Sequence, residues 1–176
     1  GRFNEALPSL EAYLASKPNG DVADFALAHV AHAQLELGRP DDARKTLETL
    51  ASKFPKSSAL PTTRLRLAEA ALTAKQYDRA AELFRLATEG ADVGLKARAR
   101  SGLGWALLQG GKANDAAIAF EVLLKETPDD PVAGDAAFAR ARALESAKQI
   151  EPALSAYETV LSRYPKSDAA GPAALA

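Results

Sequence analysis

The sequence repeats itself every 36 or 37 residues, and this periodicity constrains the fold more than any other feature. Five short turn segments begin at positions 1, 38, 75, 111 and 148. An alanine follows each turn start by five residues, and a large apolar residue follows that alanine by four, which places both on one helix face. The alanines are Ala6, Ala43, Ala80, Ala116 and Ala153, and the apolar residues are Leu10, Leu47, Phe84, Phe120 and Tyr157. This self-similarity predicts helical hairpins that stack side by side and share a ribbon-like core.

A proline closes most of the repeats. It stands twelve residues after the alanine at Pro18, Pro55, Pro128 and Pro165, whereas the third copy has Asp92 there. With these marks the pattern resembles the tetratricopeptide repeat (TPR) family over essentially the whole chain. The resemblance implies an all-α fold, a right-handed α-α superhelical solenoid of TPR-like helical hairpins. The chain departs from the family in its longer period and in lacking a large aromatic early in each first helix. Those places hold Leu27, Arg64, Arg100 and Ala137.

We expect a single solenoid domain over residues 1–176. Residues 1–20 would supply a second helix only, residues 21–57, 58–91, 92–129 and 130–167 would form four units, and residues 168–176 would start the next first helix. Because both ends lie inside repeats, we expect the chain to be a piece of a longer protein. The predicted N-caps of the first helices are Asp21, Ser57 or Ser58, Asp92 and Asp130.

Three glycines fall in the helix expected over residues 92–109, where each costs roughly 1 kcal/mol relative to alanine if it lies in the helix interior. Gly104 aligns with Ala31, Ala68 and Ala141, so we expect a small side chain there to let neighbouring helices approach closely. The alignment offers no such reason for Gly102.

Composition excludes several classes of function. The formal net charge is −1, which disfavours a strongly basic nucleic-acid binder. The absence of cysteine excludes disulfides, thiolate metal sites and a cysteine nucleophile. No uncharged apolar run approaches the roughly 18 residues of a membrane span, so we expect no direct membrane insertion.

Motifs for catalysis or cofactor binding are also missing. The segment Gly102–Gly104 lacks the third glycine of a dinucleotide fingerprint, and Gly110–Lys112 is followed by Ala113 instead of the serine or threonine of a phosphate loop. His29 and His32 have a permitted metal-ligand spacing but no obvious third ligand. We therefore expect no catalytic residue, no cofactor and no metal, and we interpret the chain as non-enzymatic.

The resemblance to TPR proteins implies that the first helices line a concave groove. It places the exposed rows eighteen, fifteen, eleven and eight residues before each marker alanine. The family's clamp for a terminal carboxylate does not match, because His32, Glu69 and Trp105 occupy the row where asparagine is wanted. Trp105, the only tryptophan, is the first candidate for a groove contact; the alternative is that it packs between helices as core. Arg142 could bind an acidic partner or pair locally with Glu145. The candidate partner-binding residues are Phe25, His32, Leu35, Leu65, Glu69, Leu72, Arg98, Trp105, Leu108, Phe138 and Arg142.

These observations favour a non-enzymatic protein–protein interaction scaffold that binds a peptide or protein segment in its concave groove. The alternative is self-assembly or intramolecular stacking through the terminal repeats within a larger multi-repeat protein. Nucleic acid is not an expected partner, because the equivalent groove positions show no repeating base-reading pair.

Two units end in an aromatic-Pro-Lys-Ser sequence, at Phe54–Ser57 and Tyr164–Ser167. Longer units of this kind are similar to those of bacterial cell-envelope TPR proteins, such as the Tol-Pal coordinator and the barrel-assembly lipoprotein. The resemblance slightly favours the bacterial periplasm or cell envelope over the cytoplasm.

Overall fold

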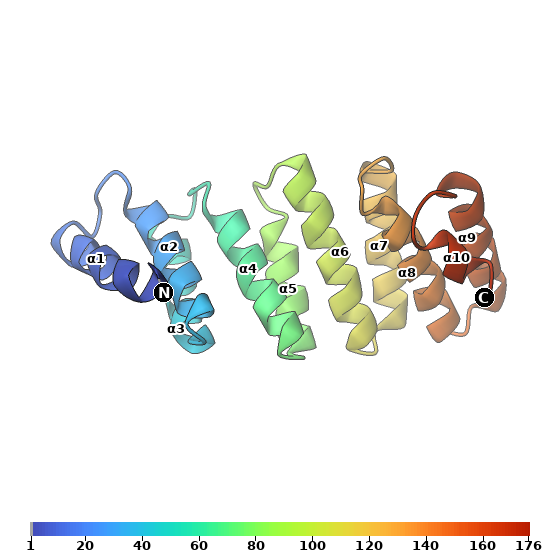
Figure 1. The fold of residues 1–176 in the computed structure, drawn as a ribbon, viewed down its shortest axis with the longest axis horizontal. Helices are drawn as coiled ribbons and strands as arrows, with labels where there is room; N and C mark the ends of the chain where they lie inside the picture. Colours follow the sequence, from blue (N-terminus) through green and yellow to red (C-terminus); the bar gives the residue numbers. More distant parts are fainter. Residues whose placement is uncertain (1) are drawn as a thin grey trace.

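A computed structural model describes residues 2–176, and these residues form helices without a β-strand. Figure 1 shows the helices standing side by side along one long axis, with the two termini at opposite ends of the row. The predicted all-α solenoid is confirmed. The helices are α1 (Arg2–Ser16), α2 (Ala23–Glu36), α3 (Pro40–Lys53), α4 (Leu60–Thr73), α5 (Tyr77–Ala87), α6 (Val93–Gln109), α7 (Ala113–Glu126), α8 (Ala133–Ser146), α9 (Ile150–Arg163) and the short α10 (Ala170–Ala173).

Four hairpins, α2–α3, α4–α5, α6–α7 and α8–α9, are joined by tight turns of the same geometry. Each turn contains one residue with positive φ, at the turn start identified from the sequence. These residues are Gly38 (φ 71°), Lys75 (φ 59°), Gly111 (φ 79°) and Lys148 (φ 59°). Glycine adopts this left-handed conformation without steric cost, whereas a side chain does not. The two turns with glycine at this position are therefore unstrained, whereas the two turns with lysine are strained.

Replacing Lys148 by glycine should stabilise the protein by about 0.5–1 kcal/mol, because it removes the strain of a side chain at positive φ. Urea denaturation followed by circular dichroism measures the change. Gln149→Gly is the control, since the neighbouring residue has φ −92° and gains nothing from glycine. An equal loss of stability in both variants would contradict the expectation.

The predicted caps are only partly correct. Asp92 is the N-cap of α6 and accepts a hydrogen bond from Leu95 N–H at 2.8 Å. Asp21 is not a cap, because α2 begins at Ala23 and Val22 stands at its N-cap without a side-chain hydrogen bond. A short hydrogen-bonded turn precedes α2, in which Ala23 N–H donates to Gly20 O at 2.9 Å. This turn shifts the helix start past the predicted residue.

The same shift occurs before α4 and α8. Ser57 Oγ accepts from Ala59 N–H at 3.1 Å, and Asp130 Oδ1 accepts from Val132 N–H at 3.0 Å. Both side chains therefore stabilise the turn that leads into the helix, two residues before the N-cap position. Pro131 also lies in the turn before α8, which begins at Ala133.

The core is built from the repeated alanine and aromatic positions. Phe84 and Phe120 are among the largest fully buried side chains, and both rings face a glycine of α6. A Cβ atom on Gly104 would lie 2.5 Å from the Phe120 ring, which confirms the expected close approach. A Cβ atom on Gly102 would lie 2.3 Å from the Phe84 ring. Gly102 therefore serves the contact between α6 and the preceding unit.

Two arginines stand where the TPR family has a large aromatic, and they bind the ends of second helices. Arg64 Nη1 donates to Leu86 O at 2.8 Å and pairs with Glu89 at 3.0 Å. Arg100 pairs with Glu126 at the end of α7. A cation is favourable at a helix C-terminus, so these arginines join the two helices of a unit by charge instead of aromatic packing.

Candidate partner-binding groove

The first helices α2, α4, α6 and α8 form one layer of the solenoid, which we call the first-helix face (Figure 1). Side chains link neighbouring helices across this layer. Arg66 Nη1 of α4 lies 2.9 Å from His32 Nε2 of α2, and Arg98 Nη2 of α6 lies 2.9 Å from Glu69 Oε1 of α4. Two residues of the row that lies eleven residues before each marker alanine, His32 and Glu69, thus each contact an arginine of the next first helix.

A hollow of about 240 Å³ lies between α2 and α4 on this face. Its wall includes Phe25, whose side chain is 47% exposed although it is aromatic. Two histidines and an arginine bring nitrogen donors to the same hollow, and three hydroxyl side chains complete it. The lining residues are Phe25, Ala28, His29, His32, Ser58, Ala59, Thr62, Thr63 and Arg66.

Arg66 is the exposed cation of this hollow. A guanidinium group can only donate, so its contact with His32 Nε2 requires that ring nitrogen to accept from Arg66. Glu36 Oε1 lies farther from the same nitrogen, at 3.4 Å. No carboxylate within residues 2–176 forms an ion pair with Arg66. Its positive charge is therefore available to an acidic group of a partner.

Trp105 and Phe138 lie at the boundary between groove and core. Both are half-buried, and each rests on an aromatic ring of a second helix. The centroids of Trp105 and Phe120 are 5.8 Å apart in an edge-to-face arrangement, and those of Phe138 and Tyr157 are 5.7 Å apart. Each side chain is thus partly buried against the core.

The remaining predicted residues differ in exposure. Leu65 is only 2% exposed and belongs to the core, so its placement in the groove is corrected. Its equivalents Ala28 and Ser101 are only partly buried. The leucines of the last row are half-buried against the core, whereas the charged residues are exposed. These leucines are Leu35, Leu72 and Leu108, and the charged residues are Glu69, Arg98 and Arg142.

Glu145 does not pair with Arg142, which corrects that alternative. Glu145 Oε2 instead accepts a hydrogen bond from the Tyr157 hydroxyl at 3.0 Å. Burial and this carboxylate raise the pKa of Tyr157 from 10.0 to about 12. The hydrogen bond connects α8 to α9 beneath the aromatic pair formed with Phe138.

The raised pKa of Tyr157 predicts a loss of stability in alkaline solution. Stability from the neutral hydroxyl is fully present below pH 10 and falls as the pH rises towards 12, because the hydroxyl of the unfolded chain loses its proton in this range whereas the native state keeps it. The urea midpoint of the wild type should drop more between these pH values than that of Tyr157→Phe. Equal drops would contradict the assignment. Tyrosinate absorbance of the two proteins provides an independent measurement of the pKa.

Other kinds of site receive no support. Within the described chain, no group of three or more His, Cys, Asp or Glu side chains could hold a metal ion, and His29 and His32 gain no third ligand. None of the helices of residues 2–176 is long and apolar enough to cross a membrane.

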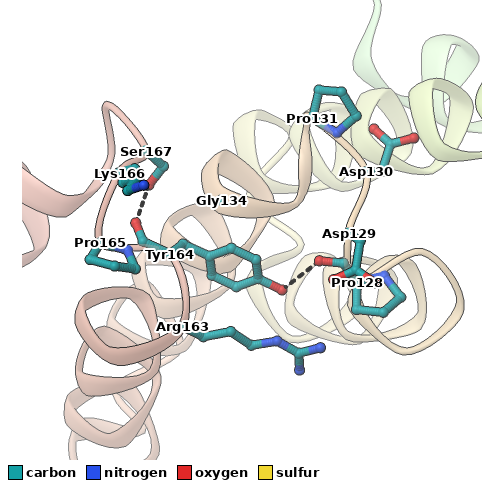
Figure 2. Close-up of a pocket in the computed structure, with 10 residues that line it drawn as sticks. All are labelled: Pro128, Asp129, Asp130, Pro131, Gly134, Arg163, Tyr164, Pro165, Lys166 and Ser167. Carbon is teal, nitrogen blue, oxygen red and sulfur yellow. Dashed lines mark hydrogen bonds between the residues drawn. The ribbon is translucent and has the colours of Figure 1, made fainter.

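A hollow at the loop edge contains the aromatic-Pro-Lys-Ser motif (Figure 2). This open cleft of about 470 Å³ lies between the α7–α8 and α9–α10 loops. Tyr164 Oη donates to Pro128 O at 3.1 Å, and Ser167 Oγ donates to Tyr164 O at 2.9 Å. Gly134 makes room for Ser167, since a Cβ atom there would lie 2.5 Å from that of the serine. The motif thus ties adjacent loops together.

Comparison with known proteins identifies the repeat. Models of the tetratricopeptide repeat match residues 1–60, 65–131 and 135–167. No curated protein matches the sequence.

Solved structures share the fold at low sequence identity. A MamA protein matches with a TM-score of 0.73 and 20% identity, covering 94% of this chain and 85% of that one. MamA from Desulfovibrio magneticus RS-1 matches with a TM-score of 0.69 and 18% identity over 96% and 89% of the two chains. The nearly identical TPR-like repeats of a Podosopora anserina kinesin light chain match with a TM-score of 0.68 and 18% identity, over 96% and 90%. The chain therefore belongs to the tetratricopeptide repeat family, whose repeats serve as protein–protein interaction scaffolds and are typically non-enzymatic.

Proposed function

We propose that the first-helix face binds a peptide or protein segment, and that the hollow between α2 and α4 holds the central contact. The observation that carries this proposal is the pairing of an exposed aromatic with a cation that lacks a carboxylate partner. Phe25 offers an apolar surface, and Arg66 offers donors for a carboxylate. A segment with an apolar side chain next to an acidic one would complement both.

The half-buried rings farther along the face supply additional anchors. Trp105 and Phe138 are held by their contacts with Phe120 and Tyr157, so little side-chain entropy is lost when a partner covers them. Arg142, exposed and without an ion pair in residues 2–176, adds a cation on α8. A segment that runs from α2 to α8 would thus meet apolar anchors and cations in alternation.

The test begins by selecting binders from a random peptide library with the immobilised protein. Phe25→Ala and Arg66→Ala should each weaken the selected peptides at least tenfold by fluorescence anisotropy, as expected for anchor residues (about 1.4 kcal/mol or more each). Both residues are exposed, so circular dichroism and melting should stay unchanged. Arg85→Ala, an exposed arginine on α5, is the matched control.

Peptides that bind all variants equally would refute the groove as the binding surface. Trp105 is a poorer first probe, because its edge-to-face contact with Phe120 contributes about 0.5–1.5 kcal/mol and Trp105→Ala removes core packing together with the anchor.

Self-association is the second candidate, and an exposed leucine on α9 favours it. Leu154 is 52% exposed, whereas its repeat counterpart Ala117 is buried. Sedimentation velocity over a hundredfold concentration range tests this candidate, and a strictly monomeric protein would exclude it.

A further inference from the structure

The second helices form the opposite layer of the solenoid, and a hollow of about 250 Å³ opens there between α3 and α5. Four apolar side chains line it: Leu47, Ala51, Leu83 and Leu86. Five charged side chains complete the lining: Arg44, Glu48, Arg64, Arg79 and Glu82. The hollow shares no residue with the one on the first-helix face.

The packing of this unit explains why the hollow exists. Leu47 stands where the later units place Phe84, Phe120 and Tyr157, so a smaller side chain supports this part of the layer. The buried cluster that contains Leu47 is separate from the one that contains Phe84 and Phe120. The layer is therefore incompletely filled between α3 and α5, and the opening can receive one bulky apolar side chain.

Arg79 is placed unfavourably unless an anion binds it. It lies in the first turn of α5, where the helix dipole disfavours a cation, next to Asp78, which pairs with Lys112. Its counterparts in the other second helices are the acidic residues Glu5, Asp42 and Asp115 and, in α9, Pro152. Within residues 2–176 its one side-chain hydrogen bond is a long one, to Gln76 Oε1 at 3.3 Å. No carboxylate within the described residues forms an ion pair with it.

The other two arginines of the hollow are already occupied. Arg44 pairs with Glu48 at 2.6 Å, and Arg64 pairs with Glu89 at 3.0 Å. Arg79 also lines a second, smaller hollow of about 90 Å³ towards α2 and α4, so it stands between two incompletely filled spaces. Within the described residues it is the one arginine of this hollow without an ion pair, and the carboxylate of Glu82 lines the same hollow.

We infer that the α3–α5 hollow is a second binding site, which takes a bulky apolar side chain of an acidic protein segment and pairs the adjacent carboxylate with Arg79. The volume suits one side chain, and the carboxylate supplies the negative charge that three of the other second helices carry at the position of Arg79. The inference rests on the family's role in protein interactions but not on the first-helix groove, which lies on the other layer.

A short peptide with one tryptophan between glutamates, acetylated and amidated at its ends, is the probe. Titration into protein with labelled methyl groups should shift the resonances of Leu47, Leu83 and Leu86 saturably. Arg79→Gln should weaken binding at least tenfold, whereas Arg85→Gln, on the same helix but outside the hollow, should leave it unchanged. Ala51→Leu should fill the hollow and abolish binding.

Arg79→Asp provides a readout that a merely structural arginine would not give. It should abolish binding and at the same time raise the midpoint of thermal unfolding, because it restores the charge found in other units. The groove variants Phe25→Ala and Arg66→Ala should leave the probe's affinity unchanged, so the two proposals fail or succeed separately. A saturable shift confined to the first-helix face, no saturable shift at all, or equal binding by a peptide with lysines in place of glutamates would overturn the inference.

Discussion

Phe120→Ala is expected to lower the free energy of unfolding by about 3–5 kcal/mol. The ring is fully buried, and it fills the space that Gly104 leaves on α6. The ring also makes an edge-to-face contact with Trp105. Its loss therefore opens a cavity and removes an aromatic pair. A domain of this size is marginally stable, which makes such a loss comparable with its total stability.

Urea denaturation followed by circular dichroism checks this expectation, with Ile118→Ala as the matched control. Ile118 lies on the same helix, two residues before Phe120, but its side chain is 60% exposed. That variant should stay within about 0.5 kcal/mol of the wild type. A comparable loss in both variants would contradict the assignment of the effect to the buried ring, because alanine raises the helix propensity at both positions.

The contrast between these neighbours shows why the fold was predictable from the sequence. The repeated alanine and aromatic positions recur at helical spacing, and the structure buries Ala116 and Phe120 together. The same helical pattern recurs in five segments, so the assignment of helices does not depend on any single ambiguous segment. Proline and the turn residues then delimit the helices to within about three residues.

Features that depend on contacts between units were not predictable. Gly102 owes its place to the ring of Phe84, which lies eighteen residues earlier in a different unit. Arg64 and Arg100 replace a family aromatic, and only the position of a helix end shows what they bind. The prediction that Asp21 caps α2 was wrong because an extra turn precedes this helix. Backbone hydrogen bonds hold that turn, and they leave no side-chain signature in the sequence.

Two of the residues that line the hollow between α2 and α4 were named from the sequence as candidates, whereas its arginine was not. Phe25 and His32 do line the hollow, whereas Arg66 lies next to the predicted row and was missed. A signal was present in the sequence. The position nine residues before each turn start holds the large residues His29 and Arg66 in the first two full units but the small residues Gly102 and Ala139 in the last two. Large polar residues at that position indicate that it faces outwards in the first half of the solenoid.

Gly102→Leu is expected to destabilise the protein by about 1–3 kcal/mol or more, because its side chain would be forced into the Phe84 ring. Phe84→Ala alone should cost about 3–5 kcal/mol, since the ring is 1% exposed. The double variant should cost less than the sum, because the leucine then occupies the space that the missing ring vacates. Residues in direct contact show coupling energies of about 0.5–3 kcal/mol.

The same leucine at Gly94 is the control, since a Cβ atom there meets only the Asp92 carboxylate, at 3.8 Å. Gly94→Leu should be neutral or stabilising by up to about 1 kcal/mol through helix propensity. Additive costs for Gly102→Leu and Phe84→Ala would mean that the two residues do not compete for one space. Sub-additive costs would instead establish that volume is exchanged between units at this contact, so that a glycine in one unit and an aromatic in the preceding unit together set the spacing of the solenoid.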